Sequence, residues 1–272
     1  MGFCRNSENS IAMKHKIVES LHGVTLAGGG PFGAALLARA VALAPVIVGA
    51  DGGADRLLRL GAEPTAVIGD FDSISATARA RLAGRLFPIA EQETTDFDKA
   101  LRSIAAPFVL GLGFAGARLD HGLAVLNALV RQADQRCLLL SPQDVTFVAP
   151  PEMRLDLPLG SRFSLFPMGA VTGESAGLRW PIQDIAFAPD GMIGTSNQVV
   201  GPVHLRVSAP RMLVILPCHH MPQAGRPDLI LPPQSTSQSV SSQICVRLFQ
   251  QGLQWHCQKV TKRKSDHDQA LH

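Results

Sequence analysis

The chain has 272 residues, of which 46% are hydrophobic and 17% charged, and its formal net charge at pH 7 is +3. This length allows one large domain or two small ones, each with a hydrophobic core. The small net charge gives no argument for nucleic acid or a membrane surface as a partner. Five scattered cysteines without CxxC spacing favour reduced thiols in a cytoplasmic protein over a disulfide framework.

No segment of the sequence predicts a secretory signal or a membrane span. The first 22 residues are polar and lack the apolar core of a signal peptide. The most apolar window, residues 34–50, is interrupted by Arg39 and Pro45, which favours a buried helix, a turn and a strand. We therefore expect no membrane partner.

Strands and helices are predicted to alternate between Val24 and about Pro150. Short β-branched or leucine-rich runs predict strands over residues 24–27, 46–50, 66–69, 86–89, 108–113, 137–140 and 145–149. Helices are predicted over about 33–43, between Gly53 and Gly61, over 75–84, from Thr95 onward and over 120–133. Thr95 and Asp98 have capping-box spacing, in which each side chain can bond a free backbone N–H of the first turn. The alternation predicts an α/β fold whose mostly parallel sheet carries helices on both faces.

The pattern changes after Pro150-Pro151, where short strand-like runs follow one another without a convincing helix. These runs cover 162–168, 184–188, 191–196, 203–208 and 212–217, and turn residues separate them. They predict a smaller all-β sandwich or barrel. We therefore expect four segments, namely an N-terminal extension (1–22), an α/β domain (23–150), an all-β domain (151–217) and an atypical, disordered tail (218–272).

Acidic side chains gather where the predicted parallel strands end. Asp51 follows the second strand, Asp70 and Asp72 follow the third, and Asp96 precedes the next helix. Because ligands bind outside the carboxyl ends of parallel strands, these acids predict one site. Crowded carboxylates must take up protons or bind a cation, and Mg²⁺ prefers one or two carboxylates together with phosphate oxygens. The pair Asp70 and Asp72 is therefore predicted to bind Mg²⁺ that a phosphate ligand brings with it.

The same strand ends carry groups that suit a phosphate ligand. Glycines such as Gly52 and Gly113 let backbone N–H groups approach phosphate oxygens. Lys99 and Arg118 can balance phosphate charge. Each feature also has an ordinary explanation, because aspartates cap helices, Arg118 with Asp120 could be a surface ion pair, and a helical lysine is usually solvated. The convergence of all of them on one sheet edge favours a site.

These residues lie in motifs that resemble thiamine pyrophosphokinase, in the order of that family and over roughly residues 23–217. The matching segments are ADGGADRLL (50–58), PTAVIGDFDSI (64–74), QETTDFDKAL (92–101), GLGFAGARLDHGLAVLNAL (111–129), GLRW (177–180) and TSN (195–197). The resemblance implies an α/β nucleotide-binding domain, a C-terminal β domain and a homodimer with active sites at the subunit interface. It also implies the Mg²⁺-dependent reaction of ATP with thiamine to give AMP and thiamine diphosphate.

The resemblance assigns roles to individual residues of this sequence. The metal and pyrophosphate cluster would consist of Asp70, Asp72, Asp96 and Asp120. The surrounding nucleotide site would include Gln92, Lys99, Arg118 and Asn127, with Asp51, Gly52 and Gly113 beside them. Thiamine would contact Trp180, Ser196 and Asn197. The sequence favours Asp72 or Asp96 only slightly over Asp70 as the acceptor of the hydroxyl proton.

Alternatives remain open at this point. A tryptophan in a β domain is usually a core residue, and Ser196-Asn197 could be only a turn. The chain could be another Mg²⁺-dependent Asp-x-Asp enzyme, such as a nucleotide-using transferase or a phosphohydrolase. It could also be a non-catalytic ATP-binding regulator, although binding alone needs fewer acids. Residues 1–22 and those after about 217 have no counterpart in the family pattern, so the tail resembles an altered or extended terminus.

Overall fold

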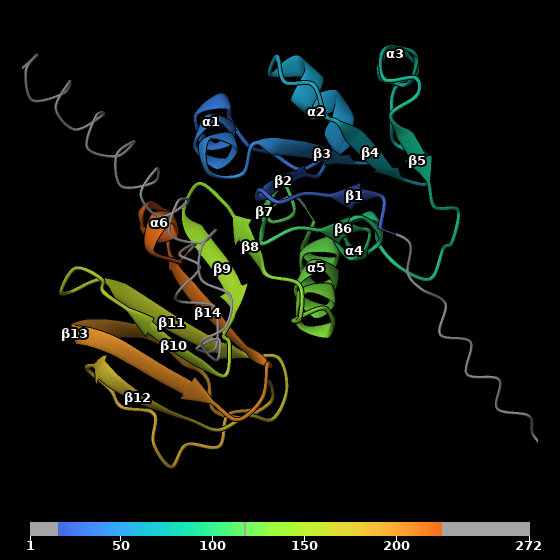
Figure 1. Cartoon of the computed structure of the whole chain (residues 1–272). Coiled ribbons are helices and arrows are strands. Elements are labelled where there is room, and N and C mark those ends of the chain that lie inside the picture. The colour runs from blue at the N-terminus through green and yellow to red at the C-terminus, as the bar shows by residue number, and fades with distance from the viewer. Residues whose placement is uncertain (1–15, 117, 225–272) are drawn as a thin grey trace, which may run out of the picture. The chain divides into compact units, whose positions relative to one another are not determined.

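A computed structural model describes residues 16–116 and 118–224, and a parallel sheet forms its centre (Figure 1). The predicted runs form parallel strands β2 (Val24–Ala27), β3 (Val46–Ala50), β4 (Ala66–Gly69), β5 (Leu86–Pro88), β7 (Val109–Leu112) and β8 (Cys137–Leu140). Their order in the sheet is β8-β7-β2-β3-β4-β5. The chain therefore builds outward from β2 first to one side and then to the other, and ligands of open α/β sheets bind beside such a reversal.

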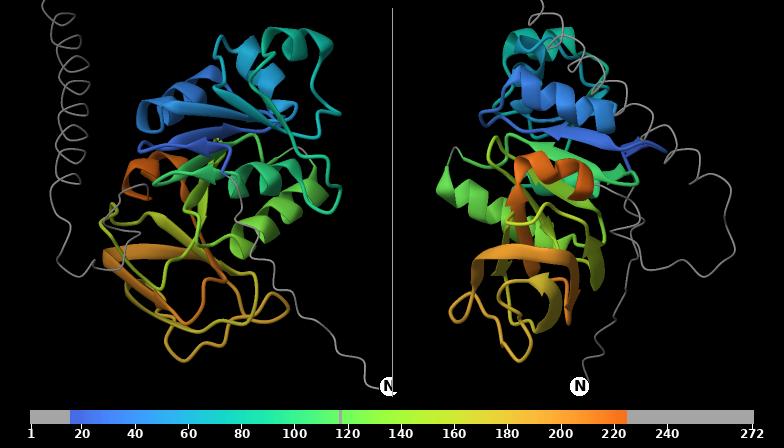
Figure 2. Two further views of the ribbon diagram at one scale, coloured as in Figure 1. Left: turned by 45° about the vertical axis from the view of Figure 1, so that its right-hand side comes forward. Right: turned by 90° about the vertical axis from the view of Figure 1, so that its left-hand side faces the viewer.

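Helices cover both faces of this sheet (Figures 1 and 2). One face carries α1 (Ala34–Leu43), α2 (Gly53–Arg59) and α3 (Ala76–Arg81), and the other carries α4 (Asp96–Arg102) and α5 (Leu119–Arg131). Side chains alternate accordingly along each strand, since Leu110 packs in the α1 core whereas Val109 packs with α4 and α5. The predicted mixed α/β fold is confirmed. Within the described residues, no helix has the length and apolar character needed to cross a membrane.

Antiparallel strands extend the sheet beyond β8. They are β9 (Asp144–Val148), β10 (Glu152–Leu155), β11 (Arg162–Pro167), β12 (Gly173–Leu178), β13 (Gly194–Val207) and β14 (Met212–Pro217). β9 pairs with β8 on one side and β14 on the other, so hydrogen bonds continue from the α/β half into the β half. The long strand β13 pairs first with β11 and then with β10 and β12, and so joins two layers of strands.

The core also continues past the boundary expected near residue 150. One buried cluster includes Leu37 of α1, Phe147 of β9 and Phe163 of β11. The run 184–188 does not form the expected strand, because Phe187 is buried but pairs only through isolated bridges to Val171 and Met192. β12 was not foreseen, because its sequence GESAGL lacks the β-branched and aromatic residues typical of strands.

The first residues of the predicted tail are folded. A 3₁₀ turn, η1 (Cys218–His220), and a short helix, α6 (Met221–Ala224), follow β14 directly. Cys218 donates its backbone N–H to the Gln143 carbonyl at 2.8 Å, and its side chain is buried. The expectation of disorder is therefore wrong for 218–224, and 225–272 lie outside the described residues. At the other end, β1 (Val18–Glu19) pairs with β6 (Ile104–Ala105), whereas residues 1–15 lie outside the described part.

Candidate active site

Two strand ends present the first two acids of the site. Asp51 directly follows β3 and Asp70 directly follows β4. A Cβ atom added to Gly69 would lie 2.9 Å from the Cβ of Asp51, so glycine is required where these strand ends meet. Asp51 and Phe71 both have left-handed backbone angles, with φ of 42° and 65°. Such conformations cost free energy and concentrate at functional sites.

The third acid comes from the start of α4. Thr95 caps this helix by accepting a 3.3 Å hydrogen bond from the backbone N–H of Asp98, which places Asp96 in the first turn. Ligand oxygens of Asp51, Asp70 and Asp96 all lie within 4.8 Å of one another. We call these residues the three-acid group. The strand-end argument from the sequence correctly predicted that the three acids would meet.

A single lysine neutralises part of this group. Lys99 lies one turn along α4, and its ammonium donates to Asp70 Oδ2 at 2.7 Å and to Asp96 Oδ1 at 3.3 Å. Its side chain is only 2% exposed. Burial opposes the lysine charge, but the two acceptors outweigh burial and raise the pKa of Lys99. Lys99 is therefore a charged, buried member of the site and not a solvated side chain.

The three acids respond differently to these surroundings. The hydrogen bond from Lys99 lowers the pKa of Asp70, whereas burial raises the pKa of Asp96 despite the attraction of Lys99. Burial raises the pKa of Asp51 to about 6. No cation contacts Asp51 among the described residues, so the cost of burying its negative charge is the least compensated of the three acids.

Asp51 also has an oxygen without a partner. Its Oδ2 accepts a 3.1 Å hydrogen bond from the backbone N–H of Ser73, but its buried Oδ1 has no hydrogen-bond partner among the described residues. A buried polar atom of this kind needs an explanation. An oxygen of this type beside two further carboxylates fits a hard cation such as Mg²⁺. Asp51, Asp70 and Asp96 are the residues that would hold it.

The raised pKa of Asp51 predicts that stabilisation by Mg²⁺ depends on pH. Below about pH 6 the proton on Asp51 competes with the metal. Without metal, this acid's contribution to the free energy of unfolding falls as pH rises from its ordinary pKa toward 6, because the folded state retains the proton longer. We expect Mg²⁺ to raise the unfolding temperature more at about pH 8 than at about pH 5. In Asp51→Asn this difference should largely vanish; an equal Mg²⁺ effect at both pH values in the unmodified chain would contradict the prediction.

Two further predicted residues border the three-acid group. Asp72 is exposed, accepts a hydrogen bond from Ser73 Oγ at 2.8 Å and donates its backbone N–H to Asp70 Oδ1 at 3.4 Å. Gln92 donates its side-chain amide to Asp70 Oδ2 at 3.4 Å. The three-acid group thus contains Asp51 and not Asp72, and the role of Asp72 as a metal ligand remains a prediction. The close approach at Gly69, which the sequence does not reveal, brings Asp51 beside Asp70.

Gly52 and Gly113 lie in the backbone beside the acids, and Gly113 occupies a tight position. Gly52 is the N-cap of α2 and directly follows Asp51. Gly113 has φ of 73°, and a Cβ atom there would lie 2.7 Å from the carbonyl oxygen of Gly28. This close packing brings the loop after β7 against the loop after β2, at the point where the strand order reverses.

The residues around α5 lie farther out. Arg118 and Asp120 form an exposed ion pair, with side chains 66% and 64% exposed, and each shifts the partner's pKa to favour its charged form. Asn127 accepts a 3.1 Å hydrogen bond from Arg131 Nε. Among the described residues, no hydrogen bond or ion pair joins Asp120 to the three-acid group. Arg118 also borders a hollow of about 450 Å³, which Phe114 and Leu123 line on its apolar side.

The predicted thiamine contacts lie together in the β half. Asn197 is buried and brackets Trp180, accepting from its backbone N–H at 3.1 Å and donating to its carbonyl at 2.6 Å. The Trp180 side chain is 55% exposed, so it is not a core residue, and the Arg179 guanidinium lies 5.1 Å from its ring centre. Ser196 is exposed with φ of 63°. The bend after β12 thus presents a tryptophan ring at the surface, held by Asn197 of β13.

Sequence reasoning missed two residues that shape the loop after β4. Asp55 of α2 accepts hydrogen bonds from the backbone and hydroxyl of Ser75, the residue that caps α3. Arg79 of α3 donates to the Phe71 carbonyl at 2.5 Å. This hydrogen bond holds Phe71, which has the left-handed backbone angle and lies between Asp70 and Asp72. Asp55 lies within the motif ADGGADRLL, but its role depends on a helix pairing that the sequence does not specify.

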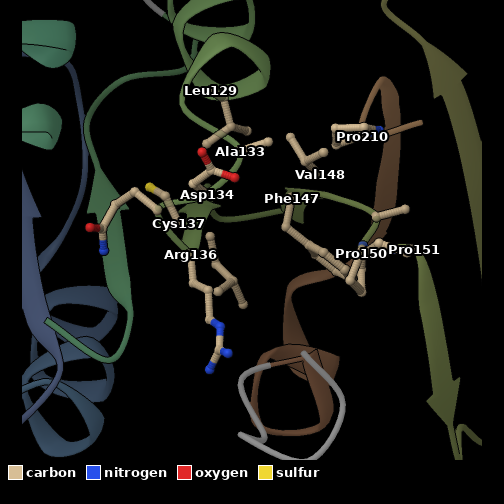
Figure 3. A pocket seen from close by; sticks show the side chains of 13 residues that line it. Leu129, Ala133, Asp134, Arg136, Cys137, Phe147, Val148, Pro150, Pro151 and Pro210 are labelled. Carbon is tan, nitrogen blue, oxygen red and sulfur yellow. The ribbon is translucent and has the colours of Figure 1, made fainter. Parts of the chain in front are cut away.

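A separate pocket of about 250 Å³ lies at the other end of the strands (Figure 3). Its walls include Leu129, Cys137, Phe147 and Pro150, and Asp134 and Arg136 lie on its rim. Cys137 begins β8, so this pocket lies at the amino-terminal edge of the parallel strands, whereas the three-acid group follows their carboxyl ends. It therefore does not compete with the three-acid group as the candidate active site.

Comparison with known proteins identifies related sequences and folds. Residues 37–140 match the family model described as thiamin pyrophosphokinase, catalytic domain. Thiamine pyrophosphokinase 1 of Oryza sativa subsp. japonica is 28% identical over 185 residues, which cover 55% of this chain and 70% of the relative. Thiamine pyrophosphokinase 2 of the same plant is 30% identical over 156 residues, covering 50% and 58%. The structure of thiamin pyrophosphokinase from Candida albicans has the same fold, with a TM-score of 0.60, 15% identity and coverage of 75% and 93%.

Proposed function

We propose that the chain is a member of the thiamine pyrophosphokinase family and transfers pyrophosphate from ATP to the hydroxyl of thiamine, giving thiamine diphosphate and AMP. The observation that carries this proposal is the three-acid group with buried Lys99 at the carboxyl edge of the parallel sheet. This arrangement suits a ligand that is a polyphosphate with a divalent cation.

The chemistry needs charge stabilisation and positioning. The thiamine oxygen attacks the β-phosphorus of ATP, the bond to the α-phosphate oxygen breaks, and AMP leaves with its electron pair. Mg²⁺, when bound by Asp51, Asp70 and Asp96, supplies positive charge for the phosphoryl oxygens. Lys99 fixes the orientation of Asp70 and Asp96 through its two hydrogen bonds. We assign acceptance of the hydroxyl proton to Asp72, because it is exposed and does not share Lys99.

We place the nucleotide along the loops at the carboxyl ends of β3, β4 and β7. Gly52 at the start of α2 and Gly113 in its tight loop offer backbone N–H groups, and Gln92 contacts Asp70 directly. Arg118 and Asp120 would reach the phosphates once their mutual ion pair opens, and Asn127 would lie beside them on α5. The apolar hollow next to Arg118 supports an organic ligand at this end.

We place thiamine on the β half, where Trp180, in the bend after β12, is hydrogen-bonded to Asn197 of β13, next to Ser196. An exposed tryptophan ring can stack on the cationic thiazolium ring. Among the described residues, no hydrogen bond, ion pair or ring contact joins these three residues to the three-acid group. A homodimer in which Trp180 of one subunit faces the acids of its partner would bring the substrates together, and exposed Leu119 and Leu123 on α5 offer an apolar contact surface. We propose a cytoplasmic, Mg²⁺-dependent homodimer.

One assay tests the proposed reaction against its rivals. The purified chain is incubated with ATP, Mg²⁺ and thiamine, and both products are quantified. Formation of AMP and thiamine diphosphate in equal amounts supports the proposal. Phosphate or ADP release that ignores thiamine would indicate another metal-dependent phosphoryl enzyme, and ATP binding without AMP release would indicate a regulator.

Loss of the Trp180 ring is expected to weaken thiamine use selectively. Trp180→Ala should raise the KM for thiamine about tenfold, because a stacked cation loses its aromatic surface. The KM for ATP should change less than twofold, because among the described residues no hydrogen bond, ion pair or ring contact joins Trp180 to the three-acid group. Trp180→Phe retains an aromatic ring, so its KM for thiamine should lie between those of the unmodified chain and Trp180→Ala. A larger change in the KM for ATP than for thiamine would place Trp180 outside the thiamine site.

A further inference from the structure

Asp98 is a buried carboxylate on α4 that the proposed chemistry does not use. Its side chain is 5% exposed, and its partners are Arg131 and Gln132, from the end of α5, and Arg102. Gln132 Nε2 donates to Asp98 Oδ1 at 2.7 Å, Arg131 Nη2 donates to Oδ2, and Arg102 Nη1 lies 3.7 Å from Oδ1. The capping-box spacing predicted that this carboxylate would turn back toward Thr95, but its bonds run to α5 instead.

The first connection leads from Asp98 to the outer part of the site. Arg131 uses one guanidinium nitrogen, Nη2, for Asp98 and another, Nε, for Asn127 Oδ1 at 3.1 Å. Asn127 lies one turn before Arg131 on α5. A planar guanidinium with two fixed acceptors holds both in one geometry. The rotamer of Asn127 is therefore tied to α4 through Arg131.

The second connection leads to the loop before α4. Arg102 Nη2 forms a 2.9 Å ion pair with Glu91 Oε1, and Arg102 Nη1 donates to Thr94 Oγ1 at 3.1 Å. These bonds hold the loop on both sides of Gln92, whose amide donates to Asp70 Oδ2. Asp98 thus connects two residues, Gln92 and Asn127, that lie far apart in the sequence.

We propose that Asp98 is a positioning residue that sets nucleotide affinity by aligning Gln92 and Asn127 with the face of α4 that carries Asp96 and Lys99. The inference rests on the proposed function, since both residues are assigned to the nucleotide. Asp96 and Lys99 belong to the part of the site where we place the reaction. Asp98 lies two residues after Asp96, on the buried side of α4 that faces α5. The carboxylate acts through the two arginines and touches neither substrate.

The test compares the substrate dependence of variants in the full chain. Asp98→Asn keeps the shape and the Gln132 contact but removes the charge that orients both arginines. We expect the KM for ATP to rise about tenfold, which corresponds to about 1.4 kcal/mol, while kcat and the KM for thiamine stay within about threefold. Arg131→Gln cuts only the connection to Asn127 and should reproduce a part of this rise; its side chain is 53% exposed, so the variant keeps the test valid if Asp98→Asn does not fold.

A double-mutant cycle distinguishes positioning from general destabilisation. If Asp98 acts through Arg131, then Asp98→Asn and Arg131→Gln should have non-additive effects on the KM for ATP. Glu63→Gln breaks an exposed ion network with Arg81 and Arg85 remote from these connections and should leave all constants unchanged. An unchanged KM for ATP in folded Asp98→Asn, or equal rises for both substrates, would overturn the proposal. If thiamine is not the acceptor, calorimetry of Mg²⁺-ATP binding still measures the nucleotide affinity of each variant. Failure of the Asp98 proposal can therefore be told apart from failure of the proposed function.

Discussion

Asp70→Asn is expected to lower kcat about 10³-fold while the protein remains folded. Asp70 belongs to the three-acid group and accepts the 2.7 Å hydrogen bond from Lys99. Asparagine can still accept that bond, but it cannot offer the negative charge that we propose to hold Mg²⁺. The phosphoryl oxygens would then lose the metal charge during transfer. Most of the loss should therefore appear in turnover and not in folding.

The measurement is steady-state formation of AMP at saturating ATP and thiamine, with thermal unfolding recorded on the same samples. Asp190→Asn is a matched control, because Asp190 is exposed and lies outside the site. This control should retain full activity. If Asp70→Asn keeps more than about a tenth of the activity, Asp70 does not hold the metal in the way proposed here.

Lys99→Met is expected to destabilise the metal-free protein by about 2 kcal/mol at neutral pH. The substitution leaves Asp70 and Asp96 without their shared buried cation, and like charges at this distance repel. The value is below that of a fully buried pair because the Asp70 and Asp96 side chains are 15% and 33% exposed. Mg²⁺ should restore part of the loss, since it supplies the missing positive charge.

Thermal unfolding with and without Mg²⁺ measures this effect. The increase in unfolding temperature on adding Mg²⁺ should be larger for Lys99→Met than for the unmodified chain. Arg81→Met is the control, because it removes an exposed cation from Glu63 and should show the ordinary Mg²⁺ response. A Mg²⁺ response that disappears in Lys99→Met would show that the lysine helps to create the metal site instead of competing with it.

The position of the site could be predicted from the sequence because topology alone decides where strand ends meet. The alternation of strands and helices specified a parallel sheet, and the acids after residues 50 and 69 then had to share an edge. The distance between Asp51 and Asp70 could not be predicted, since it depends on the close approach at Gly69. The sequence therefore located the acids at one edge but did not reveal that Asp51 lies close to Asp70 and Asp96, and the assignment of Asp72 as a metal ligand remains a prediction.

Features that depend on tertiary packing could not be predicted from the sequence. The run 184–188 has strand-like composition, but Phe187 is buried without a paired neighbour strand. Residues 218–224 look unlike a core segment, yet Cys218 is buried and its carbonyl accepts from Arg39 on α1. Asp98 has the spacing of a cap, and only the position of α5 directs its carboxylate elsewhere.

The central claim is that the oxygens of Asp51, Asp70 and Asp96 bind a divalent cation together with a triphosphate. A crystal of the full chain grown with Mn²⁺ and a non-hydrolysable ATP analogue tests it directly, because Mn²⁺ gives an anomalous signal. We predict an anomalous peak in contact with these three carboxylates and with phosphate oxygens. A nucleotide seen elsewhere, or a peak that none of the three acids contacts, would contradict the account.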